Sequence, residues 1–473
     1  MNVGRRFNAM ALLLVCAVVP ALGLAGLWKW ADSRRIPAAL DATVVEGPQA
    51  EPLITPVLSL RRTPLALAAS TNDNLLATAL APVADMVGDT SCLTVEVDGR
   101  RVLDDGGATQ VTPASNLKLL VASVALETLG ADYTFATQLK GSVSGGMVVG
   151  DLYFVGGGDP LLSTADYPSK QKYPTTNPTS VESLVAKLSA AGVTSIEGNV
   201  VGDDSRYDAE RFVPTWGPAI SGIEAGPLGA LMVNDATSSV VPGSTARYAN
   251  PALGATKDLI RVLQKAGITV GGAAKTATAP PEAGVLAVEQ SVPLSAVLGE
   301  MLTTSDDNTA ELLLKELGVH VGTRGTRQAG NAVVLATLEA RGMDTSAISL
   351  VDGSGLDSAN LVTCNVIMQI LDHESVTNPI GVGLPIAGRT GTLTTQFLGT
   401  DMVGRMHAKT GSLRNAKALS GYVTSTGGTI TFSMILDFAN ASDTSKYEPI
   451  WAALATALGT YPAGPTPEQL QPL

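Results

Sequence analysis

The feature that most constrains the fold is an apolar run, Leu117–Leu129, with a serine just before it and a lysine in its first turn. The run predicts a helix buried in the core. Ser115 and Lys118 are one helical turn apart, so a helix places both side chains on one face. A serine becomes a nucleophile when a base takes its proton, and burial favours the neutral amine that can do so. The spacing predicts a nucleophile, Ser115, and its base, Lys118. The alternative is a serine N-cap followed by an exposed lysine.

The same spacing recurs at Ser169–Lys172, in a polar stretch flanked by prolines. Nothing in this stretch predicts a helix that would hold the two side chains together. We therefore expect no chemistry from the second copy.

Composition limits the classes of function. With 45% hydrophobic and 16% charged residues, the 473-residue chain is globular, with two or three domains expected. A net charge of −12 and the lack of a basic cluster argue against nucleic acid as a partner. His320, His373 and His407 stand alone, and no C-x-x-C or H-E-x-x-H pattern is present. We therefore predict no metal and no cofactor.

The first residues predict a membrane segment that is not part of the fold. Arg5 and Arg6 precede an uncharged run of 22 residues, Phe7–Trp28, and basic residues follow it. The run is long enough to span a bilayer and longer than the apolar part of a typical signal peptide. We expect an uncleaved anchor within residues 1–30. A signal cleaved after Ala25 is the alternative, and either one exports the rest of the chain to the cell envelope.

Two cysteines, Cys92 and Cys364, lie in the exported part. An oxidising compartment allows a disulfide between them, whereas two buried reduced cysteines are equally ordinary. Both interpretations stay open.

Changes in residue pattern divide the rest of the chain. Residues 31–71, rich in proline and alanine, predict a linker, and folded structure is expected from residue 72. Residues 136–288 alternate short β-branched segments with turn residues, which predicts a β-rich insertion. Residues 72–135 and 289–473 are expected to form one α+β domain around a sheet with strands from both ends. In its last strands Ile430, Phe432, Met434 and Leu436 alternate as one buried face.

Two further motifs carry candidate site residues. Lys409-Thr410-Gly411-Ser412 lies at the edge of a predicted strand, where a lysine and two hydroxyls can hold a carboxylate and glycine lets a ligand approach. A similar triplet, Arg389-Thr390-Gly391, is not followed by a clear strand, so we take it as a chance match. Ser305-Asp306-Asp307-Asn308 opens a predicted helix with Ser305 as its N-cap.

In the order S-x-x-K, S-D-D-N, K-T-G, these motifs are similar to the signature of penicillin-binding proteins and class A β-lactamases. Five further segments extend the similarity: Phe154–Ser163, Val200–Phe212, Gly226–Thr237, Asp352–Asn360 and Gly404–Val423. Together the segments resemble the class C low-molecular-mass penicillin-binding proteins, the D-alanyl-D-alanine carboxypeptidase/endopeptidase family, over roughly 72–458. The resemblance implies a fold like that of penicillin-binding proteins and serine β-lactamases, an antiparallel sheet flanked by helices, with an insertion between the first two motifs.

The resemblance also implies a mechanism and partners. Ser115 would attack the bond between two D-alanines of a peptidoglycan stem peptide, and Lys118 would take its proton. The backbone N–H groups of Ser115 and Ser412 would form the oxyanion hole. Lys409, Thr410 and Ser412 would bind the terminal carboxylate, with Gly411 between them. Ser305 would relay a proton to the leaving amine, and β-lactams would acylate the same serine. The resemblance implies no cofactor.

One position departs from the family pattern. Counting back from Ala310-Glu311 places Asp307 where the family has asparagine, with Asn308 one position later. A carboxylate cannot donate a hydrogen bond to the substrate amide, although it can pair with Lys118. Three outcomes follow: Asn308 swings in, Asp307 substitutes, or activity is reduced. We expect substitution with activity retained. A catalytically weak or silent protein that binds peptidoglycan or a wall partner is the alternative, and a β-lactamase is a third hypothesis.

Overall fold

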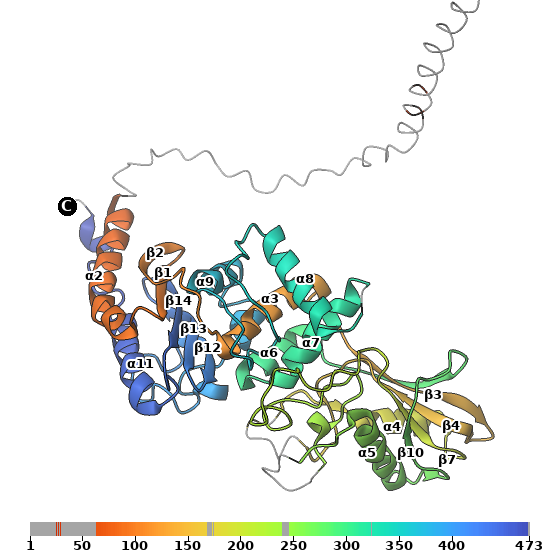
Figure 1. Ribbon diagram of the computed structural model, residues 1–473. Coiled ribbons are helices and arrows are strands. Elements are labelled where there is room, and N and C mark those ends of the chain that lie inside the picture. The colour runs from red at the N-terminus through yellow and green to blue at the C-terminus, as the bar shows by residue number, and fades with distance from the viewer. Residues whose placement is uncertain are drawn as a thin grey trace, which may run out of the picture. The chain divides into compact units, whose positions relative to one another are not determined.

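The computed structural model describes residues 63–167, 173, 175–238, 246–322 and 324–471, together with residues 25, 27 and 29. The predicted anchor, most of the linker and the second S-x-x-K copy lie outside these ranges. Within them, no helix is both long enough and apolar enough to cross a membrane. All elements below belong to the compact unit Pro64–Leu473, apart from the first residue of helix α2 (Figure 1).

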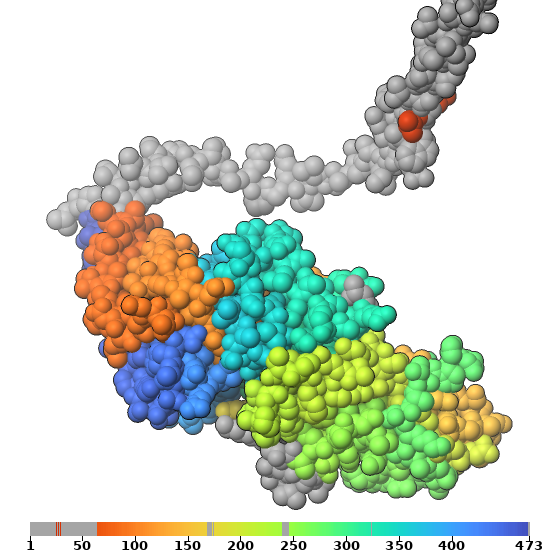
Figure 2. Space-filling model, in the orientation of Figure 1, coloured from red at the N-terminus to blue at the C-terminus, as the bar shows by residue number. Residues whose placement is uncertain are grey.

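A five-stranded antiparallel sheet joins the two ends of the described chain. Its strands follow the order β12 (Met406–Leu413), β13 (Ala416–Ser425), β14 (Gly428–Asp437), β1 (Cys92–Val97) and β2 (Arg100–Asp105). Figures 1 and 2 show the consequence, because the orange residues from the start of this unit lie directly against the blue residues of its end. Strands from both ends therefore form one sheet, as the residue pattern predicted.

Helices α2 (Thr63–Val87) and α11 (Thr444–Gly459) share a hydrophobic cluster with one face of this sheet. Ile430, Phe432, Met434 and Leu436 belong to that cluster, which confirms their predicted common face. The linker prediction was wrong at its end, because α2 begins at Thr63 and not near residue 72. Pro64 is compatible with the first helical turn, and the leucines and alanines after it are strong helix formers.

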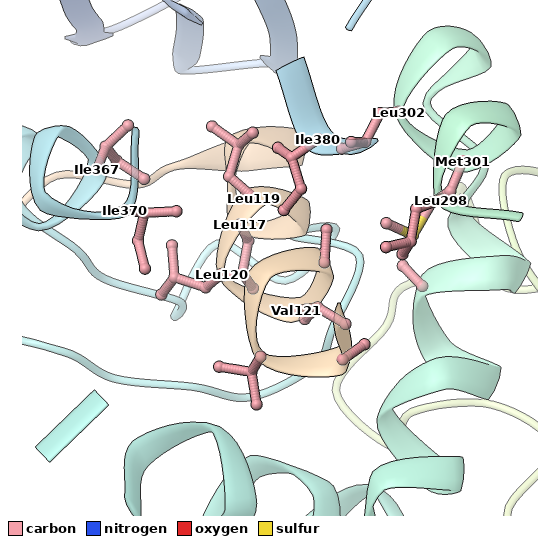
Figure 3. Close-up of a cluster of buried hydrophobic side chains, with 14 of the residues drawn as sticks. Leu117, Leu119, Leu120, Val121, Leu298, Met301, Leu302, Ile367, Ile370 and Ile380 are labelled. Atoms are coloured by element: carbon pink, nitrogen blue, oxygen red, sulfur yellow. The ribbon is translucent and has the colours of Figure 1, made fainter. Parts of the chain in front are cut away.

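The other face of the sheet packs against a block of helices. They are α3 (Leu117–Leu129), α6 (Leu294–Thr304), α7 (Asp307–His320), α8 (Arg327–Ala340), α9 (Cys364–His373) and the short α10 (Pro379–Gly383). Figure 3 shows leucines of α3 between side chains of α6, α9 and α10, so the predicted buried helix is confirmed. A disulfide joins Cys92 of β1 to Cys364 of α9, which resolves the alternative that the sequence left open.

The residues between α3 and α6 form a second sheet of seven strands. Its main path runs β10 (Ala274–Thr276), β8 (Val200–Asp203), β4 (Met147–Val155), β3 (Ala136–Ser144) and β11 (Gly284–Gln290). Strand β7 (Ser195–Ile196) pairs with β4, and β9 (Thr269–Val270) pairs with β7. Helices α4 (Val181–Ala190) and α5 (Pro251–Lys265) share its hydrophobic cluster. Strand β11 ends at Gln290 and so crosses the boundary that we placed after residue 288.

Candidate active site

The first motif forms at the start of α3. Ser115 lies in a short 3-10 turn, Ala114–Asn116, that leads directly into the helix. Lys118 is fully buried, and its Nζ lies 2.9 Å from Ser115 Oγ. The same Nζ lies 2.6 Å from Asp307 Oδ1 and 2.7 Å from the backbone oxygen of Ser354. The structure therefore joins the predicted nucleophile, its base and Asp307.

These three contacts fit both protonation states of Lys118. An ammonium has three N–H donors, one for each oxygen. A neutral amine has two N–H donors, which the Asp307 carboxylate and the Ser354 carbonyl can accept. Its lone pair then faces Ser115, whose hydroxyl donates. Proton transfer from Ser115 to Lys118 thus needs no rearrangement of the surrounding groups.

The second motif lies at the junction of α6 and α7. Asp306, and not Ser305, is the N-cap of α7, because its side chain accepts from the Thr309 N–H at 2.5 Å. The predicted N-cap was therefore wrong by one position. Ser305 instead ends α6 with a left-handed backbone, φ 64°. That turn leaves its side chain available, and Ser305 Oγ lies 2.7 Å from Lys409 Nζ.

Lys409 of β12 is fully buried and also donates to the backbone oxygen of Thr410 at 2.8 Å. Burial lowers the pKa of Lys409 well below its usual 10.5, and the positive charge of nearby Lys118 acts in the same direction, while Asp307 opposes both. The site thus holds two buried lysines and one carboxylate close together.

Asn308 does not join this group. Its side chain is buried, its Oδ1 accepts from the Gly226 N–H at 2.7 Å, and its Nδ2 donates to Asp235 Oδ1 at 3.2 Å. Both partners belong to the segment between α3 and α6. The helical step between Asp307 and Asn308 therefore turns one side chain toward Lys118 and the other toward the insertion. We assign no substrate contact to Asn308.

The motifs open into a cleft with a volume of about 1070 Å³. Its lining includes all three motifs through Ser115, Ser305, Asp307, Thr410, Gly411 and Ser412. Gly411 has a structural reason beyond ligand access: a Cβ there would lie 2.9 Å from the Pro113 backbone oxygen and 3.1 Å from Ala114 Cβ. The absence of a side chain lets β12 pack directly against the segment that carries the serine.

The sequence interpretation missed Thr392 of the Arg389-Thr390-Gly391 region. Its Oγ1 lies 2.7 Å from Thr410 Oγ1, and both residues line the cleft. Gly391, with φ 55°, is needed there because a Cβ would clash with the Thr303 backbone oxygen. The sequence does carry a signal for this region, because the triplet is similar to the third motif, but the lack of a clear strand after it favoured a chance match.

The sequence pattern also predicts no role for the loop at residues 352–355. This loop carries the Ser354 backbone oxygen that Lys118 contacts. Buried Glu311 accepts from the Gly353 and Ser354 N–H groups at 2.9 and 2.7 Å. Asp352 accepts from the Gly355 N–H at 2.9 Å and from Trp216 Nε1 at 2.9 Å. Trp216 belongs to the insertion, so a hydrogen-bonded chain runs from the insertion to Lys118. Burial raises the pKa of Glu311 to about 8, and the negative charge of Asp352 adds to this.

Comparison with known proteins agrees with this geometry. A sequence profile described as the D-Ala-D-Ala carboxypeptidase 3 (S13) family matches residues 74–245 and 233–458. The chain belongs to this family. The protein is therefore a serine-type D-Ala-D-Ala carboxypeptidase, as the motifs predicted, and the alternative of a silent binding protein is not favoured. Within the described ranges, no group of three His, Cys, Asp or Glu residues could hold a metal ion.

Relatives cover most of the chain. It is 30% identical over 456 residues to the carboxypeptidase DacB of Mycolicibacterium smegmatis, covering 94% of this chain and 95% of the relative. It is 28% identical over 451 residues to a D-alanyl-D-alanine carboxypeptidase of Actinomadura sp. strain R39, covering 78% and 81%. The fold is similar to penicillin binding protein 4 (dacB) from Haemophilus influenzae, with a TM-score of 0.66, 22% identity and coverage of 81% and 99%.

Proposed function

We propose that the protein hydrolyses the bond between the two D-alanines of peptidoglycan stem peptides through an acyl-enzyme on Ser115. The observation that carries this proposal is the contact of Lys118 Nζ with Ser115 Oγ at 2.9 Å. No other base is needed, because the lysine can accept the serine proton while it donates to Asp307 and to the Ser354 oxygen.

In the first half of the reaction, Ser115 Oγ attacks the carbonyl carbon and its proton passes to Lys118. The backbone N–H groups of Ser115 and Ser412 stabilise the oxyanion. The C–N bond then breaks, and the proton that Lys118 took from Ser115 passes through Ser305 to the leaving amine. Lys409 supports that delivery, since its Nζ lies 2.7 Å from Ser305 Oγ. In the second half, water attacks the ester and gives one proton to Lys118, which passes it to Ser115 Oγ as the ester bond breaks and the shortened peptide leaves.

Binding of the terminal carboxylate falls to Lys409, Thr410 and Ser412 around Gly411. Thr392 supports this arrangement, because its hydroxyl lies 2.7 Å from the Thr410 hydroxyl and restricts its direction. Asp307 replaces the usual asparagine as the partner of Lys118, with activity retained. β-Lactams carry a strained amide and a carboxylate that match the same groups, so they acylate Ser115.

The wider setting belongs to the same proposal. A fold relative with a TM-score of 0.53, 21% identity and coverage of 80% and 94% is a predatory peptidoglycan endopeptidase from Bdellovibrio bacteriovorus. Endopeptidase activity on cross-linked stem peptides is therefore a second expected activity. Phe7–Trp28 anchors the enzyme in the cytoplasmic membrane or directs its secretion, and the catalytic unit acts in the cell envelope.

The test measures D-alanine released from an acylated tripeptide that ends in D-Ala-D-Ala. The native enzyme should release one D-alanine per peptide, and the Ser115→Ala variant should release none. A cross-linked peptide dimer in the same assay separates endopeptidase from carboxypeptidase activity. Equal release by the native enzyme and the variant would refute the proposed nucleophile.

A further inference from the structure

Besides Lys118 and Lys409 of the motifs, a third lysine, Lys417, lies in the lining of the cleft. Lys417 of β13 is the cross-strand partner of Ser412 of β12, and its Nζ lies 2.7 Å from Ser412 Oγ. Side chains of paired residues lie on one face of a sheet, and so do residues two apart along a strand. Lys417, Ser412 and Thr410 therefore share one face, and all three line the cleft.

Two aromatic rings of α11 hold this lysine in place. Its Nζ lies 4.1 Å from the centre of the Tyr447 ring and 4.9 Å from that of the Trp451 ring. Cation–π contacts of this kind stabilise an ammonium and fix its position. With the ammonium held against the two rings, Lys417 donates a hydrogen bond to Ser412 Oγ.

The charge of Lys417 is not neutralised locally. Within the described residues, no carboxylate forms an ion pair with it, and Glu448 is the one acidic group that acts on its charge. Arg414, a second basic residue, also lines the cleft. Burial lowers the pKa of Lys417 to about 8, so that most of the side chain remains protonated at neutral pH. Lys417 is thus a partly buried cation that has no anionic partner and lines an open cleft. Such a cation is suited to bind a negatively charged group of the substrate.

We propose that Lys417 is a specificity-determining residue that, together with Ser412, binds the carboxylate of the leaving residue. This inference rests on the proposed function, because that function brings a terminal carboxylate to Thr410 and Ser412. Lys417 acts in two ways. It adds a positive charge next to the carboxylate, and it orients Ser412 so that the hydroxyl proton points to the ligand while the oxygen accepts from Lys417.

The test compares two acylated tripeptides ending in D-Ala-D-Ala, one with a free terminal carboxylate and one with that carboxylate converted to an amide. The measured quantity is the ratio of kcat/KM for the acid to kcat/KM for the amide, in the native enzyme and in two variants. We expect Lys417→Met to lower this preference for the acid about tenfold, mainly through a higher KM. Lys417→Arg keeps the charge and should retain the preference within about threefold.

Two outcomes would overturn the inference. One is an unchanged preference in Lys417→Met, and the other is an equal loss in both variants, which would mean that packing on the aromatic rings matters and charge does not. If Lys417→Met fails to fold, Lys417→Gln replaces it, with thermal unfolding as the check. Labelling by penicillin is measured on the same samples. Labelled variants with an unchanged preference refute only the role of Lys417, whereas a native enzyme that neither labels nor cleaves refutes the proposed function.

Discussion

Replacing Asp307 with asparagine should raise the rate at which Ser115 is acylated at acid pH. Asp307 Oδ1 lies 2.6 Å from Lys118 Nζ, and the two side chains are 14% and 0% exposed. A carboxylate at this distance in a nearly dry site favours the protonated form of an amine. Asparagine keeps the oxygen acceptor, removes the negative charge and adds a donor for the substrate amide. In the variant, the neutral amine of Lys118, the form that takes the serine proton, is therefore no longer disfavoured by a neighbouring negative charge.

The size of this effect follows from the contact between the two charges. Direct contact with one opposite charge changes the free-energy difference between the neutral and charged forms of a buried group by about 1.4–4 kcal/mol. On the acid side of the rate profile, each 1.4 kcal/mol corresponds to about a tenfold change in the fraction of active base. At a pH where the native enzyme is mostly inactive, Asp307→Asn should therefore be acylated at least about tenfold faster.

The assay is the second-order rate of acylation by a labelled penicillin between pH 4.5 and 9. Asp307→Ala is the matched control, because it removes the charge and the acceptor together and should be slow at every pH. If the acid limbs of the native enzyme and of Asp307→Asn coincide, the charge of Asp307 does not govern Lys118, and our account of this position is wrong.

Three further predictions concern stability. Because the pKa of Glu311 is raised from 4.5 to about 8 in the folded protein, its contribution to the free energy of unfolding is present below about pH 4.5 and is lost as pH rises to 8. The free energy of unfolding of Glu311→Gln, measured in urea, should therefore rise relative to that of the native protein between pH 5 and pH 8. A difference between the two proteins that stays constant over this range would contradict this. Trp216→Phe, which removes a hydrogen bond to buried Asp352, should lower the unfolding free energy by about 1–3 kcal/mol, and an unchanged urea midpoint would count against it. Replacing both Cys92 and Cys364 with alanine should lower it by about 2–4 kcal/mol, and a variant as stable as the native protein would show that the disulfide adds nothing.

Local pattern was sufficient for much of the site. The apolar run Leu117–Leu129 is longer than a typical buried strand and so indicates a buried helix, whose start brings Ser115 and Lys118 together. The alternation in β14 likewise predicted its buried face. Such features depend on residues close in sequence, so periodicity and spacing carry them. The order of the three motifs then identified the family.

Contacts between distant segments could not be predicted in this way. The hydrogen bond of Trp216 to Asp352 joins the insertion to the helical domain, and the one between Thr392 and Thr410 joins a loop to an edge strand. Neither residue stands in a periodic pattern. The N-cap of α7 was predicted one residue too early for a similar reason. Ser305 and Asp306 are both good N-cap residues, and the tertiary contact of Ser305 with Lys409 decides between them.

The most direct test of the central claim is the covalent labelling of the enzyme by a radioactive or fluorescent penicillin, followed by mass spectrometry of the labelled peptide. The account predicts one label per chain, attached to Ser115, and none in Ser115→Ala protein whose thermal unfolding matches that of the native enzyme. A label on any other residue, or a label that persists in Ser115→Ala, would contradict it.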